Sequence, residues 1–145
     1  MTTPNADLHC HSVMSDGTLT PEALAPRAAA NGVTLWSLTD HDEIAGQARA
    51  LQAAHAAGMK YLTGTEISVS FAGQTVHIVG LGFDAHDPRM AQGLLKTRGG
   101  RGQRAQEMAD QLAAVGIPGC YEGALRFVGN PELISRTHFA RHLVE

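Results

Sequence analysis

The sequence has little cysteine, no excess of positive charge and no long apolar run. Its two cysteines, Cys10 and Cys120, make a poor disulfide framework, and the N-terminal residues MTTPNADLHC lack the basic and apolar regions of a secretory signal. We therefore expect a cytoplasmic location. The net charge of -3 argues against a general nucleic-acid coat, and no run is long enough to span a bilayer. A small phosphorylated substrate in a local pocket remains compatible with this charge.

Histidine, by contrast, is abundant and clustered. Four of the eight histidines, His9, His11, His41 and His77, sit beside strand-like runs. Because alternate residues of a strand share a face, His9 and His11 should point to one side and Cys10 to the other. One metal ion can take both imidazoles from that arrangement, and Cys10 then fits a small buried apolar residue. Two histidines that end a strand by chance are the alternative.

Strand-like segments alternate with helical patterns in the first part of the chain. They read ADLHCH, VTLWSLTD, KYLTGTEISVS and TVHIVGLGF. This order predicts an α/β fold in which helical crossovers connect parallel strands and a hairpin follows. A turn at Ala72 and Gly73 would place Ser68 opposite His77 in that hairpin.

Two helices are predicted between these strands. The first has Thr20 as its N-cap and Pro21 as its first residue, and Pro26 should kink or fray its start. The second, EIAGQARALQAAHAAG, ends at a glycine and carries His55 on its apolar stripe.

The character of the sequence changes after DAHDPRM. From Ala91 to Gly116 the pattern is helical, and the segment RGGRGQR that interrupts it is interpreted as an exposed linker, with contact to phosphate as the alternative. We place a boundary near residue 92, which divides the chain into residues 1–92 and a helical insertion, residues 93–145.

The segment TDHDE places another histidine at the end of a predicted strand. Functional residues of α/β barrels gather at the C-terminal ends of strands, where His9, His11 and His41 fall. We predict His41 as a metal ligand. Asp40 and Asp42 are interpreted either as helix N-caps or as residues that support the ligands.

Two carboxylates complete the candidate site. In the predicted hairpin Glu66 shares a face with His77 and lies diagonally across the strand pair, at roughly 7–8 Å between backbones. Asp16 belongs to an Asp-Gly turn, which is generic by itself but gives a plausible oxygen ligand near His9 and His11. Mixed imidazole and carboxylate ligands suit manganese, zinc or iron.

Four linked segments, DLHCHSVMSDGTLTP, LTDHDEIAG, GTEISV and VHIVGLGF, resemble the PHP family, named for polymerase and histidinol phosphatase. The match covers residues 7 to about 83, in order and with family-like spacing. It implies the first part of a distorted (β/α)7 barrel that holds two or three divalent metal ions at the C-terminal ends of its strands. Manganese is the favoured metal, with zinc, iron or magnesium as alternatives.

The resemblance also implies a ligand set. The residues that match the family's ligand positions are His9, His11, Asp16, His41, Glu66 and His77. By this resemblance His9 and His11 would hold one ion. Asp16 and His41 would share another, and Glu66 would bridge two ions.

The segment NPELISRTHFARHLVE resembles the helical insertion of one PHP branch. That branch removes phosphate from nucleoside 3',5'-bisphosphates, and some members trim short RNA from its 5' end. Ser135, Arg136 and His138 match positions expected to face the substrate, and a solvated helix start is the alternative reading.

The resemblance therefore implies a metal-dependent phosphoesterase acting on small phosphorylated nucleotides or short RNA, without a DNA duplex or a membrane as partner. Metal-activated water would attack phosphorus without a serine or cysteine nucleophile. Another PHP phosphatase, such as a histidinol phosphatase, and a non-catalytic metal-binding module are the alternatives. The sequence makes no prediction of oligomeric state.

Members of the family are considerably longer and carry a late histidine and a terminal Asp-x-His, neither of which is found here in the expected place. FARHLVE also ends in mid-helix. We therefore expect further chain to follow, and we expect residues 1–145 alone to be poorly stable and essentially inactive.

Overall fold

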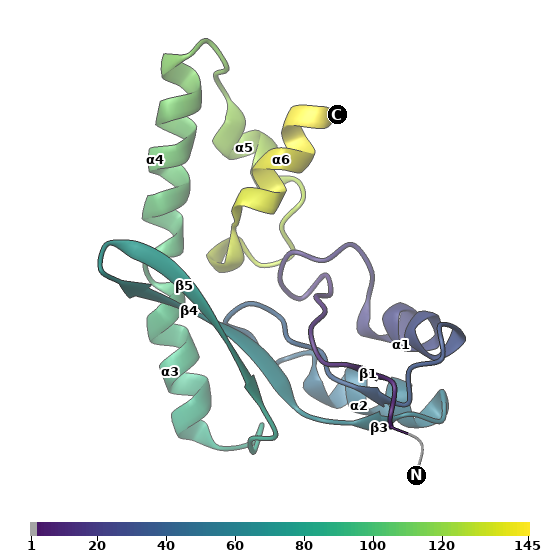
Figure 1. Cartoon of the computed structure of the whole chain (residues 1–145). Helices are drawn as coiled ribbons and strands as arrows, with labels where there is room; N and C mark the ends of the chain where they lie inside the picture. The colour runs from purple at the N-terminus through teal and green to yellow at the C-terminus, as the bar shows by residue number, and fades with distance from the viewer. Residues whose placement is uncertain (1–2) are drawn as a thin grey trace.

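Short parallel strands and their helical connections form the first part of the molecule. The computed structural model describes residues 3–145. In it β1 (Ala6–Asp7), β2 (Leu35–Trp36) and β3 (Lys60–Tyr61) form a parallel sheet in the order β1-β2-β3. The crossovers are α1 (Pro21–Ala30) and α2 (Gln47–Ala56), which lie beside this sheet in Figure 1. The predicted order of parallel strands and helical crossovers is confirmed.

The strands of the parallel sheet are shorter than predicted. Beyond their two-residue ladders, the segments are joined only by isolated backbone hydrogen bonds. Beyond β1 and β2, the Ser37 amide donates to the Asp7 carbonyl at 3.0 Å, and the Thr39 amide donates to the Cys10 carbonyl at 2.9 Å. The segment that carries the first histidines therefore still runs alongside the end of β2, although it is no longer part of a regular ladder.

The two crossover helices differ in how well their sequences predicted them. Thr20 caps α1 by accepting a hydrogen bond from the Ala23 amide, as predicted, and the helix starts at Pro21 and continues through Pro26, so the expected fraying is wrong. In α2 the predicted apolar stripe is wrong. Its buried face is formed by Gln47, Ala50 and Ala54, whereas Leu51 and His55 are exposed.

The hairpin follows the predicted register. β4 (Gly64–Phe71) pairs with β5 (Gln74–Leu81) in antiparallel fashion, and Ser68 lies opposite His77. Ala72 and Gly73 both have positive φ angles, of 51° and 78°, which suits a two-residue hairpin turn. The hairpin extends from the parallel sheet towards the helical part of the chain (Figure 1).

The buried side-chain amide of Gln47 is one of the links between β4 and the parallel sheet. The Gln47 side chain is 3% exposed, and its Nε2 donates to the carbonyls of Leu38 (3.0 Å) and Gly64 (2.8 Å). Its Oε1 accepts from the Gly64 amide (3.1 Å) and from the Tyr61 hydroxyl (2.7 Å). One helix side chain therefore satisfies polar groups at the end of β2, at β3 and at the start of β4.

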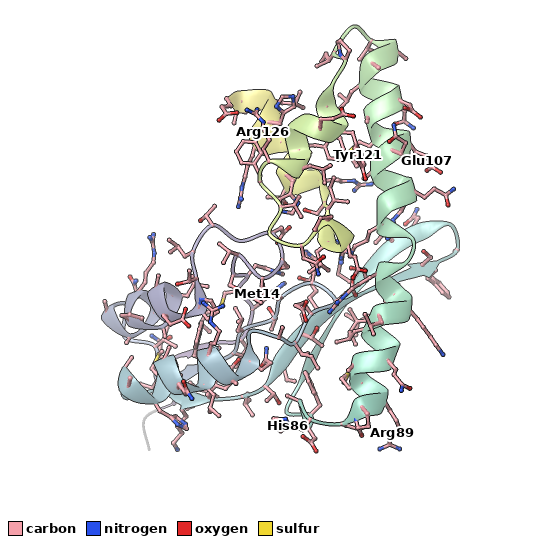
Figure 2. The ribbon with its side chains drawn as sticks, turned by 180° about the vertical axis from the view of Figure 1, so that it is seen from behind. Met14, His86, Arg89, Glu107, Tyr121 and Arg126 are labelled. Carbon is pink, nitrogen blue, oxygen red and sulfur yellow. The ribbon has the colours of Figure 1, made fainter. Side chains whose placement is uncertain are left out.

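The second part of the chain is helical. Its elements are α3 (Pro88–Arg98), α4 (Arg101–Ala114), α5 (Cys120–Leu125), a 3-10 turn (Pro131–Leu133) and α6 (Arg136–Val144). Ala105, Ala109, Ala124 and Phe139 belong to its own buried cluster. Figure 2, drawn from behind, marks Glu107 on α4 and Tyr121 on α5. The division at residue 92 stays a prediction, and α3 already begins at Pro88.

None of the helices in residues 3–145 combines the length with the apolar character that crossing a bilayer demands. A cytoplasmic location stays a prediction.

Two arginines fasten the helical part to the segment after β2. Arg101 is 7% exposed and donates to the Asp42 carboxylate at 2.6 Å and to the Ser68 hydroxyl at 2.8 Å. Arg98 donates to the Asp42 carbonyl at 2.8 Å and lies 2.9 Å from the Glu43 carboxylate. The interpretation of RGGRGQR as an exposed linker is therefore wrong for Arg98, which ends α3, and for Arg101, which begins α4 and neutralises a buried carboxylate.

Replacing Gln47 by leucine should destabilise the fold strongly. The change keeps the approximate size of the side chain but leaves several buried polar groups unpaired, so the free energy of unfolding should fall by about 2–4 kcal/mol. Urea denaturation measures this change. Gln52→Leu on the exposed side of the same helix is the matched control and should shift stability by less than about 0.5 kcal/mol. Equal effects of the two changes would contradict the role given to Gln47.

Candidate metal centre

The loop that carries Asp16 is held in place by the buried carboxylate of Asp40. This carboxylate is 1% exposed and accepts from the Ser12 amide (2.7 Å), the Ser12 hydroxyl (2.6 Å) and the Ser15 hydroxyl (2.6 Å). Burial raises the pKa of Asp40 although these three donors oppose the rise. Asp40 therefore supports the site, and the alternative of a helix cap is wrong because Gly46 is the N-cap of α2.

The predicted histidines come together in a row that starts after β1 and ends on β5. The ring centroids of His9 and His11 are 5.2 Å apart, and those of His11 and His41 are 4.6 Å apart. His77 continues the row, with its ring centroid 5.0 Å from that of His41. The structure thus brings together four histidines from three different segments of the chain.

The carboxylate of Glu66 lies at the centre of this row. Its Oε2 is 2.9 Å from Nε2 of both His9 and His11. The Nδ1 atom of His41 is 3.7 Å from the same oxygen, and Nδ1 of His77 is 3.9 Å from Oε1. Glu66 is therefore the carboxylate within reach of all four imidazoles.

Asp16 faces the ring nitrogens of His11 and His41 that are turned away from Glu66. Its Oδ1 lies 3.6 Å from Nδ1 of His11, and its Oδ2 lies 3.8 Å from Nε2 of His41. Burial opposes ionisation of Asp16, but its histidine neighbours and a hydrogen bond from Thr137 hold the pKa below its ordinary value.

The side chains form overlapping triads in which one donor atom of each member lies within 4.8 Å of the others. These triads are His9 with His11 and Glu66, His11 with Asp16 and His41, and His41 with Glu66 and His77.

The protonation states of these groups fit a divalent cation. Burial, which outweighs the nearby Asp16 carboxylate, lowers the pKa of His41 to about 4, so its imidazole is neutral at pH 7. Burial opposes ionisation of Glu66, but the His9 hydrogen bond and the other histidines lower its pKa. In the described part of the chain the buried Nδ1 atoms of His11 and His41 have no hydrogen-bond partner. Imidazoles with free nitrogen atoms beside carboxylates whose pKa is lowered are a donor set for such a cation.

Cys10 points away from this group, as strand alternation predicts. Its thiol donates to the Ser37 carbonyl at 3.5 Å and packs against the buried cluster that contains Trp36 and Leu38. Burial raises the pKa of Cys10 to about 12, so the thiolate form that binds metals is not present near neutral pH.

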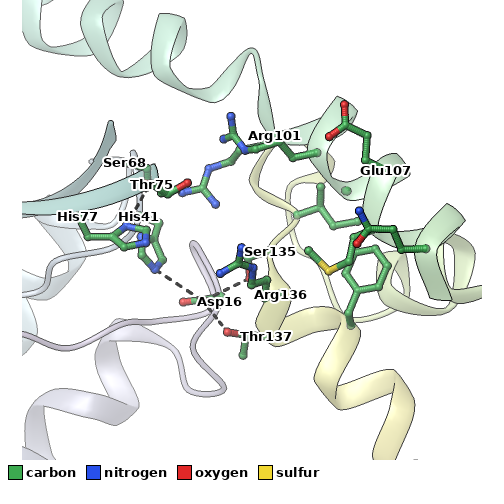
Figure 3. Close-up of a pocket in the computed structure, with 16 residues that line it drawn as sticks. Asp16, His41, Ser68, Thr75, His77, Arg101, Glu107, Ser135, Arg136 and Thr137 are labelled. Carbon is green, nitrogen blue, oxygen red and sulfur yellow. Dashed lines mark hydrogen bonds and ion pairs between the residues drawn. The ribbon is translucent and has the colours of Figure 1, made fainter. Parts of the chain in front are cut away.

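A pocket of about 470 Å³ opens beside the carboxylates and histidines (Figure 3). Asp16, His41 and His77 line one end of it. Three arginines add positive charge to its wall: Arg101, Arg104 and Arg136. Its volume lies in the range of small-molecule sites, and its exposed arginines, Arg104 and Arg136, could contact an anionic ligand, although Asp16 and Glu107 also line it.

The residues predicted to face the substrate are placed differently from one another. Ser135 and Arg136 line the pocket, whereas His138 is fully buried and its Nδ1 accepts from the Ser135 amide at 3.0 Å as part of the α6 cap. Their contact with substrate stays a prediction. Thr137 and Arg101 also line the pocket. Sequence reasoning missed Thr137 and considered Arg101 only through the alternative that RGGRGQR contacts phosphate. The one signal for Thr137 was its place in the first turn of a helix between two predicted site residues.

Known proteins share both the sequence and the fold. The chain is 54% identical over 141 residues to a 3',5'-nucleoside bisphosphate phosphatase of Chromobacterium violaceum. This alignment covers 97% of the chain and 50% of the relative. The chain is also 44% identical over 143 residues to a 5'-3' exoribonuclease of Haemophilus influenzae. That alignment covers 99% of the chain and 52% of the relative. The chain thus spans about half the length of the curated relatives it matches.

Solved structures agree with this similarity. A structure described as an amidohydrolase from Chromobacterium violaceum with bound sulfate superposes with a TM-score of 0.91 at 54% identity, over 97% of this chain and 49% of that chain. One described as a metal-dependent phosphoesterase from Bifidobacterium adolescentis superposes with a TM-score of 0.85 at 32% identity, over 99% and 50%. The PHP domain model matches residues 7–115, and the chain belongs to the PHP domain family.

Proposed function

We propose that this chain is the metal-binding part of a phosphoesterase that hydrolyses phosphate monoesters of nucleotides. The substrate class we favour is the nucleoside 3',5'-bisphosphates, with loss of the 3'-phosphate. The observation that carries the proposal is the row of four histidines around Glu66, of which His41 and His77 line a pocket whose wall also holds three arginines. The relative named as a bisphosphate phosphatase supports it.

The overlapping triads suggest how the ligand groups of this chain would be distributed among neighbouring ions. His9 and His11 would hold one ion, Asp16 and His41 would share another, and Glu66 would bridge two, because its carboxylate belongs to more than one triad. His77 would complete the group on β5. Two or three divalent ions, manganese in the first place, would supply charge neutralisation and activation of the attacking water.

Arg136 is the residue we assign to a phosphate that is not cleaved. It is exposed, begins α6 and lines the pocket, so its guanidinium can bind a phosphate in bidentate fashion. Arg101 is less suited to this task because the Asp42 carboxylate already engages it at 2.6 Å. A pocket with several arginines favours a substrate with more than one phosphate, which argues against histidinol phosphate.

Short RNA is the second candidate substrate. The Haemophilus influenzae relative is named a 5'-3' exoribonuclease, and a 5'-terminal phosphate presents the same chemistry to Arg136. The absence of a DNA duplex or a membrane among the partners stays a prediction, as does the alternative of a non-catalytic metal-binding module.

The substrate class is tested with the whole protein loaded with Mn²⁺, by measuring release of inorganic phosphate. A nucleoside 3',5'-bisphosphate should be hydrolysed with a higher kcat/KM than a nucleoside 5'-monophosphate or histidinol phosphate. A preference for histidinol phosphate would support the other phosphatase reading. Metal binding without any phosphate release would support the non-catalytic module.

His9→Ala should lose metal, and Cys10→Ala should keep it. The first change removes an imidazole from one triad, whereas the second removes a thiol that packs against the core. Inductively coupled plasma mass spectrometry of protein equilibrated with Mn²⁺ and then desalted gives the metal content. Loss of metal in the Cys10 variant would refute the assignment of the ligands to one face.

Arg136→Ala should weaken use of a bisphosphate much more than use of a simple phosphate monoester. A bidentate charged contact is worth roughly 1.5–3 kcal/mol, so kcat/KM for the bisphosphate should fall about 10- to 100-fold. Steady-state kinetics of the whole protein on both substrates measures the ratio. Arg126→Ala is the control, because Arg126 lies outside the pocket and pairs with Glu145. Equal losses on both substrates would point to a structural role for Arg136.

A further inference from the structure

The carboxylate of Asp16 is held by a helix far away in the sequence. Its Oδ2 accepts a hydrogen bond from the Thr137 hydroxyl at 2.9 Å and a longer one from the Ser135 hydroxyl at 3.3 Å. Arg141, one turn further along α6, donates to the backbone carbonyl of Asp16 at 2.8 Å. Figure 3 shows Ser135 and Thr137 directed towards Asp16, with dashed lines marking these contacts.

These contacts fix the orientation of the carboxylate, so that each of its oxygens faces a different histidine. Oδ2 takes the two hydroxyl hydrogen bonds and lies 3.8 Å from Nε2 of His41, whereas Oδ1 is turned towards Nδ1 of His11, at 3.6 Å. Hydroxyl groups donate to a carboxylate without adding positive charge that would repel a cation. The arrangement therefore orients Asp16 and leaves its negative charge available to the site.

Within residues 3–145 the Asp16 carboxylate accepts hydrogen bonds from no group outside α6 and its cap. Asp40 holds the loop at Ser12 and Ser15, and Asp16 itself lies beyond those anchors. Without α6 the direction of the Asp16 side chain would depend on a short polar loop alone.

We propose that Thr137 is a positioning residue that, together with Ser135 and Arg141, aims Asp16 at a bound divalent cation. This inference rests on the proposed metal centre. It gives the helical part a role beyond covering substrate, because the first turn of α6 completes the geometry of a ligand that the N-terminal part supplies. The same turn presents Arg136 to the pocket, so the contact with substrate and the orientation of Asp16 depend on one piece of backbone.

Thr137 offers a cleaner test than Ser135. The Ser135 hydroxyl also lies 3.1 Å from Nδ1 of His138 in the cap of α6, so removing it would disturb the helix start. The Thr137 hydroxyl makes its side-chain hydrogen bond to Asp16. Thr137→Val removes that hydroxyl at nearly constant size, and Thr137→Ser restores it without the methyl group.

The experiment is a titration of the whole metal-free protein with Co²⁺, followed by its visible absorption, for the parent and both variants. Removal of a residue that orients a metal ligand typically weakens metal binding about 10- to 100-fold, so we expect a loss in that range for Thr137→Val. Thr137→Ser should bind within a few-fold of the parent. The matched control is Thr97→Val, because the Thr97 hydroxyl donates to Gly93 in its own helix, α3. Thermal unfolding of each metal-free protein is measured in parallel.

The outcomes separate the positioning role from its rivals. Unchanged Co²⁺ binding by Thr137→Val, or equal weakening by Thr137→Val and Thr137→Ser, would overturn the proposal. A metal-free Thr137→Val that unfolds at a clearly lower temperature than Thr97→Val would show a structural residue and would overturn it too. If the parent chain binds no Co²⁺, the proposed metal centre itself is wrong, and the positioning role falls with it.

Discussion

Two backbone hydrogen bonds to Glu66 join the parallel sheet to the hairpin, and the rest of the site depends on them. The Glu66 amide donates to the Asp40 carbonyl at 3.1 Å, and the Asp42 amide donates to the Glu66 carbonyl at 2.9 Å. This bridge fixes His41 beside Glu66. The two residues beside His41 contact different parts of the molecule. Asp40 accepts hydrogen bonds from the Ser12–Ser15 loop, and Asp42 forms an ion pair with Arg101 of α4. One short segment thereby aligns the N-terminal loop, the hairpin and the helical part.

This alignment concentrates acidic groups in a small volume, and each of them has a different form of compensation. Asp42 is fully buried, and the Arg101 guanidinium neutralises it directly. Asp40 is stabilised by three hydrogen-bond donors without a cation of its own. Glu66 and Asp16 have mainly imidazoles nearby, and the imidazole of His41 is neutral at pH 7. Within residues 3–145 neither Glu66 nor Asp16 forms an ion pair with a lysine or an arginine, so a divalent cation could supply their compensation.

Local sequence patterns predicted the parts of the site that lie within single elements. The alternation of a strand placed His9 and His11 on one face and Cys10 on the other, and the two-residue turn fixed Ser68 opposite His77. The predicted apolar face of α2 was wrong, because alanines and Gln47 form the buried face of this helix, while the larger Leu51 is 39% exposed. The size of an apolar side chain does not predict which face of a helix is buried where helices pack closely through small side chains.

Contacts between distant segments had no such local signal. Arg101 lies in a glycine-rich run that is typical of linkers, and its burial depends on Asp42, which is 59 positions away. Thr137 and Asp16 are separated by 121 positions. These contacts also assign different tasks to the arginines of the pocket. Arg101 is ion-paired with Asp42, whereas Arg104 and Arg136 line the pocket as exposed side chains. Under the proposed function, Arg104 and Arg136 would contact an anionic substrate, whereas Arg101 would stabilise the segment that carries His41.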